Sequence, residues 1–144
     1  METIIVSACL LGDKCRYDGK DNYNEKVKLL RENFNIVPIC PETFGKLPTP
    51  RDPSEIRGDR IITNKGKDVT SNFNEGRDCV INIVKYLHIQ KAILVDKSPS
   101  CGLTKIHNGL FNNKLVDGEG ITTKALRKLG VECYSIDEID KIIK

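Results

Sequence analysis

Short apolar runs alternate with longer amphipathic stretches along this 144-residue chain. Four of the runs are short and rich in β-branched residues, a pattern typical of strands that are buried on both faces of a parallel sheet. These runs cover residues 3–8, 35–39, 91–95 and 132–136. Helical stretches separate them, so consecutive strands can pair in parallel through helical crossovers. The pattern therefore predicts an open α/β sheet.

Apolar residues recur at helical spacing in four other stretches. We expect helices that begin near Asn24, at Thr70 or Ser71, at Ile121 or Thr122, and after Ser135. Leu29 in the first helix and Leu129 in the third are expected to face the core, with Gly130 as a stop signal. Ser135 and Glu138 have the spacing of a capping box, so the apolar residues that follow are expected to pack.

Three further segments are irregular or resemble hairpins. Residues 40–60 are rich in proline and too long for a simple connection, which is common in loops that carry function. Residues 61–69 are predicted to form a small hairpin that turns at residues 64–66. Residues 106–120 alternate and turn like a second hairpin, which we expect to lie over the functional site.

The composition is that of an ordinary globular protein, with 39% hydrophobic and 30% charged residues. A chain of this length is expected to form a single domain, residues 1–144, around one core. The net charge of +3 permits a polyanionic partner such as tRNA but does not indicate one, because Lys and Arg form no clustered stripe. The pattern makes no prediction of the oligomeric state.

The N-terminus and the cysteine content suggest a reducing compartment. Met1 leads almost directly into the first strand without the regions of a signal peptide, and no apolar stretch approaches the roughly 18 residues that a membrane span needs. We therefore expect a cytoplasmic protein without membrane contact. In such a compartment six cysteines indicate metal binding or catalysis rather than disulfides.

Three cysteines, Cys9, Cys40 and Cys101, stand at or just past the ends of apolar runs. The carboxyl ends of parallel strands converge at one edge of a sheet, so these thiols can meet there and suggest a metal site. No CxxC motif occurs, and His88 and His107 are not spaced like zinc ligands. A closed zinc site would need a fourth ligand, whereas three thiolates can hold a 4Fe-4S cluster with one iron open. On spacing alone, zinc, iron–sulfur and merely buried thiols all stay in consideration.

The remaining cysteines are interpreted differently. Cys79 in the long helix and Cys133 in the last strand are expected to be small buried hydrophobes. Cys15 follows Cys9 by six residues in a loop. It is either a loop residue, a further ligand or a resolving thiol.

Polar residues beside these cysteines are candidates for proton transfer and substrate binding. Glu42 can act as a general acid or base, or it can cap a helix or pair with Arg51 or Arg57. Ser98 can relay a proton or simply form a Ser-Pro turn. Arg51 can anchor an anion or carbonyl group, and Tyr17 can stack on a flat ring. Surface and loop roles are the competing interpretations for both.

Four collinear motifs carry a resemblance to a known family. The motifs SACLLGDKCRYDG, VPICPETFGKLPTPRDPSEI, KDVTSNFNEG and SPSCGLTKIHNGLF look like those of the domain-of-unknown-function family 523, whose characterised members include thiouracil desulfidases. The resemblance spans nearly the whole chain. It implies a Rossmann-like three-layer sandwich, with a mainly parallel sheet of about four strands and helices on both faces.

The resemblance also implies a site and an activity. A 4Fe-4S cluster would be held by Cys9, Cys40 and Cys101, with the fourth iron open to the sulfur of a thiolated pyrimidine. Glu42 and Ser98 match the assisting glutamate and serine by motif, and the products would be the oxo base and sulfide. The expected substrate is a free base or nucleoside, because relatives that act on thiolated tRNA carry an additional C-terminal domain.

Small departures from the family pattern bear on substrate choice. Lys46 stands where a glycine is common, and His107 and Asn108 stand where Tyr and Asp are frequent. The main alternative hypothesis is a non-catalytic sensor or carrier that binds an iron–sulfur cluster or zinc through the same thiols. A metal-free nucleotide-binding domain is disfavoured, because no GxGxxG or Walker A motif follows a strand.

Overall fold

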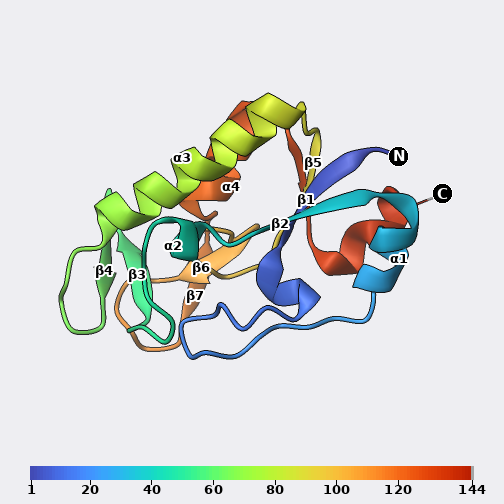
Figure 1. Ribbon diagram of the computed structural model, residues 1–144. Coiled ribbons are helices and arrows are strands. Elements are labelled where there is room, and N and C mark those ends of the chain that lie inside the picture. Colours follow the sequence, from blue (N-terminus) through green and yellow to red (C-terminus); the bar gives the residue numbers. More distant parts are fainter. Residues whose placement is uncertain (144) are drawn as a thin grey trace.

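A four-stranded parallel sheet forms the centre of the computed structural model, which describes residues 1–143 (Figure 1). Its strands are β1 (Thr3–Ser7), β2 (Asn35–Ile39), β5 (Lys91–Ile93) and β8 (Glu132–Tyr134), in the spatial order β2-β1-β5-β8. All three strand pairs are parallel. The predicted α/β class and parallel sheet are confirmed, although β5 and β8 end two residues earlier than expected.

Helices cover both faces of this sheet. On one face lie α3 (Thr70–Leu87) and α4 (Ile121–Lys128), and on the other lie α1 (Val27–Asn33) and the 3-10 helix η2 (Ile136–Lys141). The side chains of β1 alternate between these layers: Ile5 packs in the α3–α4 core, and Ile4 and Val6 pack in the α1–η2 core. Hence the three central residues of the strand are all apolar, and the expected three-layer sandwich is confirmed.

Two leucines that were expected to face the core are exposed instead. In the short helix α1 the buried side chains are those of Val27 and Leu30, three residues apart, and Leu29 lies outside their stripe. Leu129 caps α4 and is followed by Gly130 at φ 84°, so the chain turns away before Leu129 can reach the core. The predicted stop at Gly130 and the capping box that opens η2 are both present.

The first hairpin differs from the prediction in register. Strand β3 (Ser54–Arg57) pairs antiparallel with β4 (Arg60–Thr63), whereas residues 61–69 were expected to form the hairpin by themselves. The turn predicted at residues 64–66 exists, but beyond it only an isolated bridge joins Ile62 to Asp68. Gly58, at φ 59°, supplies the left-handed residue for the actual turn. The second predicted hairpin is present as β6 (Lys105–His107) and β7 (Leu115–Asp117).

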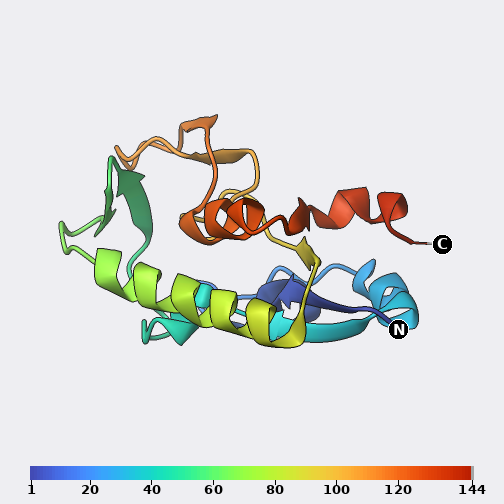
Figure 2. The same ribbon diagram turned by 90° about the horizontal axis from the view of Figure 1, so that it is seen from above.

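The order of the strands creates a crevice at their carboxyl ends. From β1 the chain goes to β2 on one side and later returns to β5 on the other, which is the arrangement at which open α/β sheets bind ligands. The 3-10 helix η1 (Ala8–Leu11) follows β1, and the one-turn helix α2 (Pro41–Phe44) follows β2. Both hairpins lie toward this end of the molecule, opposite the two termini (Figures 1 and 2).

Close packing of α2 on α3 depends on two glycines. A Cβ atom added to Gly76 of α3 would lie 1.7 Å from the carbonyl oxygen of Pro41, and one added to Gly45 would lie 2.0 Å from that of Asn72. Only glycine allows the two backbones to approach so closely. The short helix after β2 is therefore fixed in position by the longest helix of the fold.

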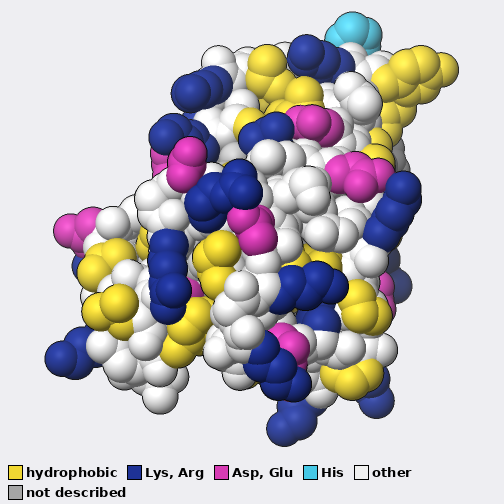
Figure 3. All heavy atoms as spheres, turned by 90° about the vertical axis from the view of Figure 1, so that its left-hand side faces the viewer, with side chains coloured by type: hydrophobic (Ala, Val, Ile, Leu, Met, Phe, Trp, Pro, Cys, Tyr) yellow, Lys and Arg dark blue, Asp and Glu magenta, His cyan; other side chains and the backbone are white. Residues whose placement is uncertain are grey.

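The surface at the hairpin end carries mixed charge. Lysine and arginine side chains are interspersed with acidic and apolar ones rather than gathered into one stripe (Figure 3). Many are already paired, as in the exposed Lys46–Glu75 and Arg60–Asp68 ion pairs. No helix among residues 1–143 is both long and apolar enough to cross a membrane.

Candidate active site

A cleft of about 800 Å³ opens at the carboxyl ends of β1, β2 and β5. Strand ends and their loops form one wall, and the two hairpins supply residues to the other. Its lining includes Ser7, Cys9, Cys15, Tyr17, Asn22, Cys40, Glu42, Arg51, Glu55, Asp96, Ser98, Cys101, His107, Phe111 and Asn113. A smaller cavity of about 400 Å³ between β4, α3 and α4 contains no cysteine. The chemistry-bearing residues therefore share the larger cleft.

The three strand-end thiols all line this cleft, as the sheet geometry predicts. Cys9 follows β1 in η1, Cys40 is the N-cap of α2, and Cys101 lies in the loop after β5. Cys9 and Cys101 are buried, and Cys40 is half-buried. Asn22 donates a hydrogen bond to the Cys9 sulfur at 3.4 Å. Burial raises the pKa of Cys101, against a hydrogen bond from Ser7 that lowers it.

Cys15 lies in the same group of thiols as Cys9 and Cys40. Its position in the sequence alone did not decide whether it would join them. Together with Ala8 and Cys9 it forms a small buried cluster against which Cys40 packs. The neighbouring Cys15 thiol lowers the pKa of Cys40 to about 6 and also lowers the pKa of Cys9. The same contacts raise the pKa of Cys15, and the Cys40 sulfur also lies 3.9 Å from the Cys15 carbonyl oxygen.

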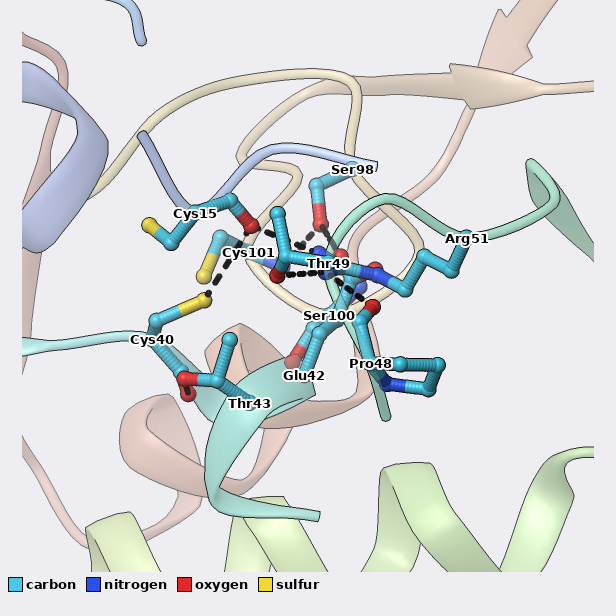
Figure 4. A network of polar contacts seen from close by, with 10 residues as sticks. All are labelled: Cys15, Cys40, Glu42, Thr43, Pro48, Thr49, Arg51, Ser98, Ser100 and Cys101. Carbon is cyan, nitrogen blue, oxygen red and sulfur yellow. Dashed lines mark hydrogen bonds and ion pairs between the residues drawn. The ribbon is translucent and has the colours of Figure 1, made fainter. Parts of the chain in front are cut away.

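Arg51 is the buried partner of Glu42. Its side chain is only 6% exposed, and Nε donates to Glu42 Oε1 at 3.2 Å (Figure 4). Nη2 donates to the Cys15 carbonyl oxygen at 2.8 Å, and Nη1 donates to the oxygens of Pro48 and Thr49. Four donor contacts are thus made within the protein. Arg51 therefore joins the cysteine loop to Glu42 and has little capacity left to anchor a substrate.

Ser98 faces the other oxygen of Glu42. Its hydroxyl donates to Glu42 Oε2 at 3.3 Å, and its oxygen accepts hydrogen bonds from the backbone N–H groups of Ser100 at 3.0 Å and Cys101 at 3.1 Å (Figure 4). The two contacts with the backbone are those of an ordinary Ser-Pro turn, which was the alternative interpretation of Ser98. Because both backbone N–H groups point at the oxygen, the hydroxyl hydrogen is directed at the carboxylate.

Asp96 organises the loop that carries Ser98 and Cys101. One carboxylate oxygen accepts the backbone N–H groups of Lys97 at 2.8 Å and Leu103 at 2.7 Å. Burial raises the pKa of Asp96, but hydrogen bonds from Leu103, Lys97 and Thr104 together outweigh it and hold the pKa below its ordinary value. No short motif marks this role, since Asp96 lies after the strand like many loop residues.

The hairpin wall contains residues that the sequence pattern did not single out. Glu55 of β3 is 7% exposed and accepts hydrogen bonds from the backbone of Gly109 and Phe111. Arg57, the alternative partner considered for Glu42, donates to the Gly109 carbonyl oxygen instead. His107 is considered in the sequence only as a poorly spaced zinc ligand and as a departure from the family pattern, yet it lines the cleft. Periodicity could not find these contacts because they join two separate hairpins.

Other predicted residues lie partly or wholly elsewhere. Tyr17 borders the cleft but is 43% exposed. Cys79 was expected to be buried and is exposed, because it stands on the solvent side of α3. Cys133 is half-buried and packs against the core, and burial raises its pKa to about 11. Lys46 adopts φ 67°, which explains why glycine suits that position.

The thiols are not arranged as a site for one metal ion. Among residues 1–143, no group of three or more His, Cys, Asp or Glu side chains is placed to hold such an ion. All six cysteines are free. What the cleft combines is a set of soft sulfur donors, a carboxylate with a fixed orientation, and a hydroxyl donor beside it.

Comparison with known proteins defines the family. The family described as 2-thiouracil desulfurase matches residues 4–138 of the chain. This protein belongs to that family, and the identification made from the four motifs is confirmed.

Two relatives cover almost the full length of the chain. The uncharacterized protein YbbK of Bacillus subtilis (strain 168) is 36% identical over 150 residues, which include 97% of this chain and 99% of YbbK. A solved structure described as the 4Fe-4S-dependent thiouracil desulfidase TudS is 39% identical, with a TM-score of 0.93 over 99% of this chain and 95% of TudS. The fold described above is therefore that of a structurally known desulfidase.

Proposed function

We propose that this protein is an iron–sulfur-dependent desulfidase that acts on a thiolated pyrimidine base or nucleoside such as 2-thiouracil. Water replaces the ring sulfur, so a thiocarbonyl group and water give a carbonyl group and hydrogen sulfide without net oxidation. One observation carries the proposal: three strand-end thiols share a cleft with a shielded Glu42–Ser98 pair. Membership of the 2-thiouracil desulfurase family and the similarity to TudS support it.

Cys9, Cys40 and Cys101 would hold the 4Fe-4S cluster. The donor set fits this group, because cysteine sulfurs are the usual ligands of iron–sulfur clusters. Asn22 and Ser7 contact two of these sulfurs, as residues that orient metal ligands commonly do. When bound, the cluster supplies a Lewis-acidic iron that attracts the soft thiocarbonyl sulfur.

Glu42 is the proposed general base. Arg51 fixes one carboxylate oxygen and Ser98 meets the other, so the group is held in one orientation at the cleft. A carboxylate placed in this way can take a proton from the attacking water while the new carbon–oxygen bond forms. It can then return that proton to the departing sulfur, and the hydroxyl group added to the ring carbon gives up the second proton of hydrogen sulfide as the carbonyl forms.

Ser98 is proposed to act as a hydrogen-bond donor. Two backbone N–H groups occupy the lone pairs of its oxygen, so the oxygen is poorly suited to attack a substrate. Its hydrogen is available to Glu42 in the structure, and to a ring nitrogen or oxygen of the substrate when one is bound. The role of Ser98 is therefore to orient its partners.

The second candidate function is a non-catalytic carrier or sensor built on the same thiols. The Glu42–Arg51 ion pair favours it, since a structural salt bridge explains Glu42 without any chemistry. In that case Arg51 and Ser98, the two hydrogen-bond partners of Glu42, would serve only to hold the loops together. Activity measurements on matched variants separate the two functions.

The test is anaerobic reconstitution with iron and sulfide, followed by assay of sulfide release from 2-thiouracil. We expect about four irons per chain, broad visible absorbance and turnover. Glu42→Gln and Ser98→Ala are expected to keep the iron, while Glu42→Gln lowers kcat by about 10²- to 10⁴-fold.

Exposed residues of the same types serve as matched controls. Glu75→Gln and Ser71→Ala apply the same changes on α3 and are expected to leave turnover intact. Protein that stays iron-free after reconstitution contradicts the proposal. Iron-loaded protein that converts no thiolated pyrimidine favours the carrier.

A further inference from the structure

The hairpin wall of the cleft is held in a fixed position. Glu55 Oε1 accepts the backbone N–H groups of Gly109 at 2.8 Å and Phe111 at 3.2 Å, and Arg57 Nε donates to the Gly109 carbonyl oxygen at 2.6 Å. A Cβ on Gly109 would lie 2.7 Å from the carbonyl oxygen of Ile56, so the two hairpins are in close contact. The tip of the β6–β7 hairpin cannot shift without breaking these contacts.

The same tip carries unusual backbone conformations beside the cleft. Phe111 has φ 53° and Asn113 has φ 61°, and both residues line the cleft. The left-handed region is uncommon for a bulky residue such as phenylalanine, and strained residues of this kind concentrate at ligand-binding sites. The structure thus maintains a costly conformation at residues that line the same cleft as the strand-end thiols.

His107 is the residue of this wall with unused hydrogen-bonding capacity. Its Nδ1 atom is sealed from solvent and has no partner among residues 1–143. A buried N–H without an acceptor is rarer in proteins than an acceptor without a donor. We therefore assign the ring hydrogen to Nε2, on the part of the ring that is not sealed. Since the side chain lines the cleft, it offers one N–H donor there.

We infer that His107 is a specificity-determining residue, which donates a hydrogen bond from Nε2 to the exocyclic oxo oxygen of a thiolated pyrimidine. The inference rests on the proposed desulfidase function and deepens it. The strand-end thiols and His107 line the same cleft, so in the proposed pose the exocyclic sulfur would lie at the thiols and the exocyclic group on C4 would lie near His107. A lone N–H donor pairs with an oxo group and is left facing another donor when that group is an amine.

The chemical class selected is therefore a thiopyrimidine that carries an oxo group, as in 2-thiouracil, rather than an amino group, as in 2-thiocytosine. A site that leaves a polar group unpaired with the wrong substrate discriminates more strongly than one that only fills space. One lost hydrogen bond with an unsatisfied donor corresponds to a preference of roughly 10- to 100-fold in kcat/KM.

The experiment compares 2-thiouracil with 2-thiocytosine on reconstituted protein. His107→Phe removes the donor and is expected to abolish most of the preference by lowering kcat/KM for 2-thiouracil. His107→Gln supplies an amide that can donate or accept, and is expected to convert both substrates with similar kcat/KM. His88→Gln applies the same change at the other histidine, outside the cleft, and should leave the ratio unchanged. Circular dichroism and the melting temperature report on folding of each variant.

Binding of the oxo products supplies a readout that needs no turnover. Calorimetry with uracil and cytosine should show the same preference in wild type and its loss in His107→Phe. Equal binding of the two bases to wild type, or an unchanged ratio in His107→Phe, overturns the inference while the desulfidase function stands. A uracil preference that depends on His107, in protein that converts no thiopyrimidine, instead contradicts the proposed function alone.

Discussion

The two walls of the cleft differ in how completely their polar groups are paired. On the strand wall, Glu42 is bonded through both oxygens and Ser98 makes three hydrogen bonds. On the hairpin wall, a buried nitrogen of His107 has no partner among residues 1–143. A wall with paired groups is prepared for one chemistry. On the hairpin wall, the other ring nitrogen of His107, Nε2, is the donor assigned to substrate recognition. The difference suggests that the strand wall sets kcat and the hairpin wall sets the choice of substrate.

The physical origin of this difference lies in how each wall is supported. The strand wall continues a parallel sheet that is buried under helices on both faces. The hairpin wall consists of two-stranded units, which are marginal when isolated, and it depends on a few contacts such as those of Glu55. Four substitutions test the comparison, from the largest expected effect to the smallest.

Removal of a strand-end thiol should have the largest effect. Cys101→Ser takes away a buried sulfur of the strand wall and is expected to abolish both iron binding and turnover. Cys79→Ser makes the same change at an exposed cysteine and should leave both unaffected. Iron analysis after anaerobic reconstitution measures the outcome. Full iron content in Cys101→Ser would exclude this thiol as a ligand.

Loss of Arg51 should affect both stability and kcat. Arg51→Met leaves the Glu42 carboxylate without its buried partner, so we expect the free energy of unfolding to fall by about 3 kcal/mol. Urea unfolding measures this change. We expect kcat to fall by roughly tenfold or more, because Glu42 loses its fixed orientation.

A double-mutant cycle distinguishes positioning from a general loss of structure. In a Glu42→Gln background, Arg51→Met should reduce kcat only slightly, since the group it positions is already absent. Arg51→Lys should keep part of both effects, because lysine retains the charge but lacks the planar donor fork. Equal losses in the two backgrounds would mean that Arg51 does not act through Glu42.

Loosening of the hairpin wall should raise KM more than it lowers kcat. Glu55→Ala leaves two backbone N–H groups at the hairpin tip without their acceptor. We expect KM for 2-thiouracil to rise by several-fold, in line with about 1 kcal/mol for a lost hydrogen bond. Glu55→Gln keeps an acceptor oxygen and should behave nearly like wild type. A fall in kcat alone would contradict the division of roles between the walls.

The smallest expected effect is on the pH dependence of stability, through Asp96 in the loop after β5. Hydrogen bonds hold the pKa of Asp96 below its ordinary value in the folded protein. Asp96 therefore contributes stability above its unfolded pKa of about 4, and that contribution is lost as the pH falls through the folded pKa. Wild type should lose more unfolding free energy between about pH 5 and pH 3 than Asp96→Asn. Urea unfolding of both proteins at the two pH values measures these losses. A loss in Asp96→Asn that equals or exceeds the loss in wild type would contradict the prediction.

Local pattern was sufficient to predict the sheet and the strand-end cysteines. Residues of a strand that is buried on both faces must be apolar at consecutive positions, so Ile4, Ile5 and Val6 of β1 stand out in the sequence. The edge strand β2 is only partly buried, but its apolar run is also visible. Parallel pairing then brings Cys9, Cys40 and Cys101 to one edge without any knowledge of side-chain packing. The capping box at Ser135 was equally visible, because both of its partners lie within one helical turn.

Contacts between distant segments were decided only by the tertiary structure. The choice of Arg51 rather than Arg57 as the partner of Glu42, and the position of Cys15 against Cys9, depend on how loops pack. The register of the first hairpin depended on β3, a strand too short and polar to be recognised.

What the sequence by itself determined is the family, the parallel sheet and the set of thiols at its edge, because each of these follows from neighbouring residues. What only the tertiary structure decided is which side chains are paired and which are left unpaired in the cleft. Pairing depends on burial and on distances between residues such as Glu55 and Gly109, which lie 54 positions apart along the chain. Spacing along the sequence carries no information about such contacts until the chain has folded.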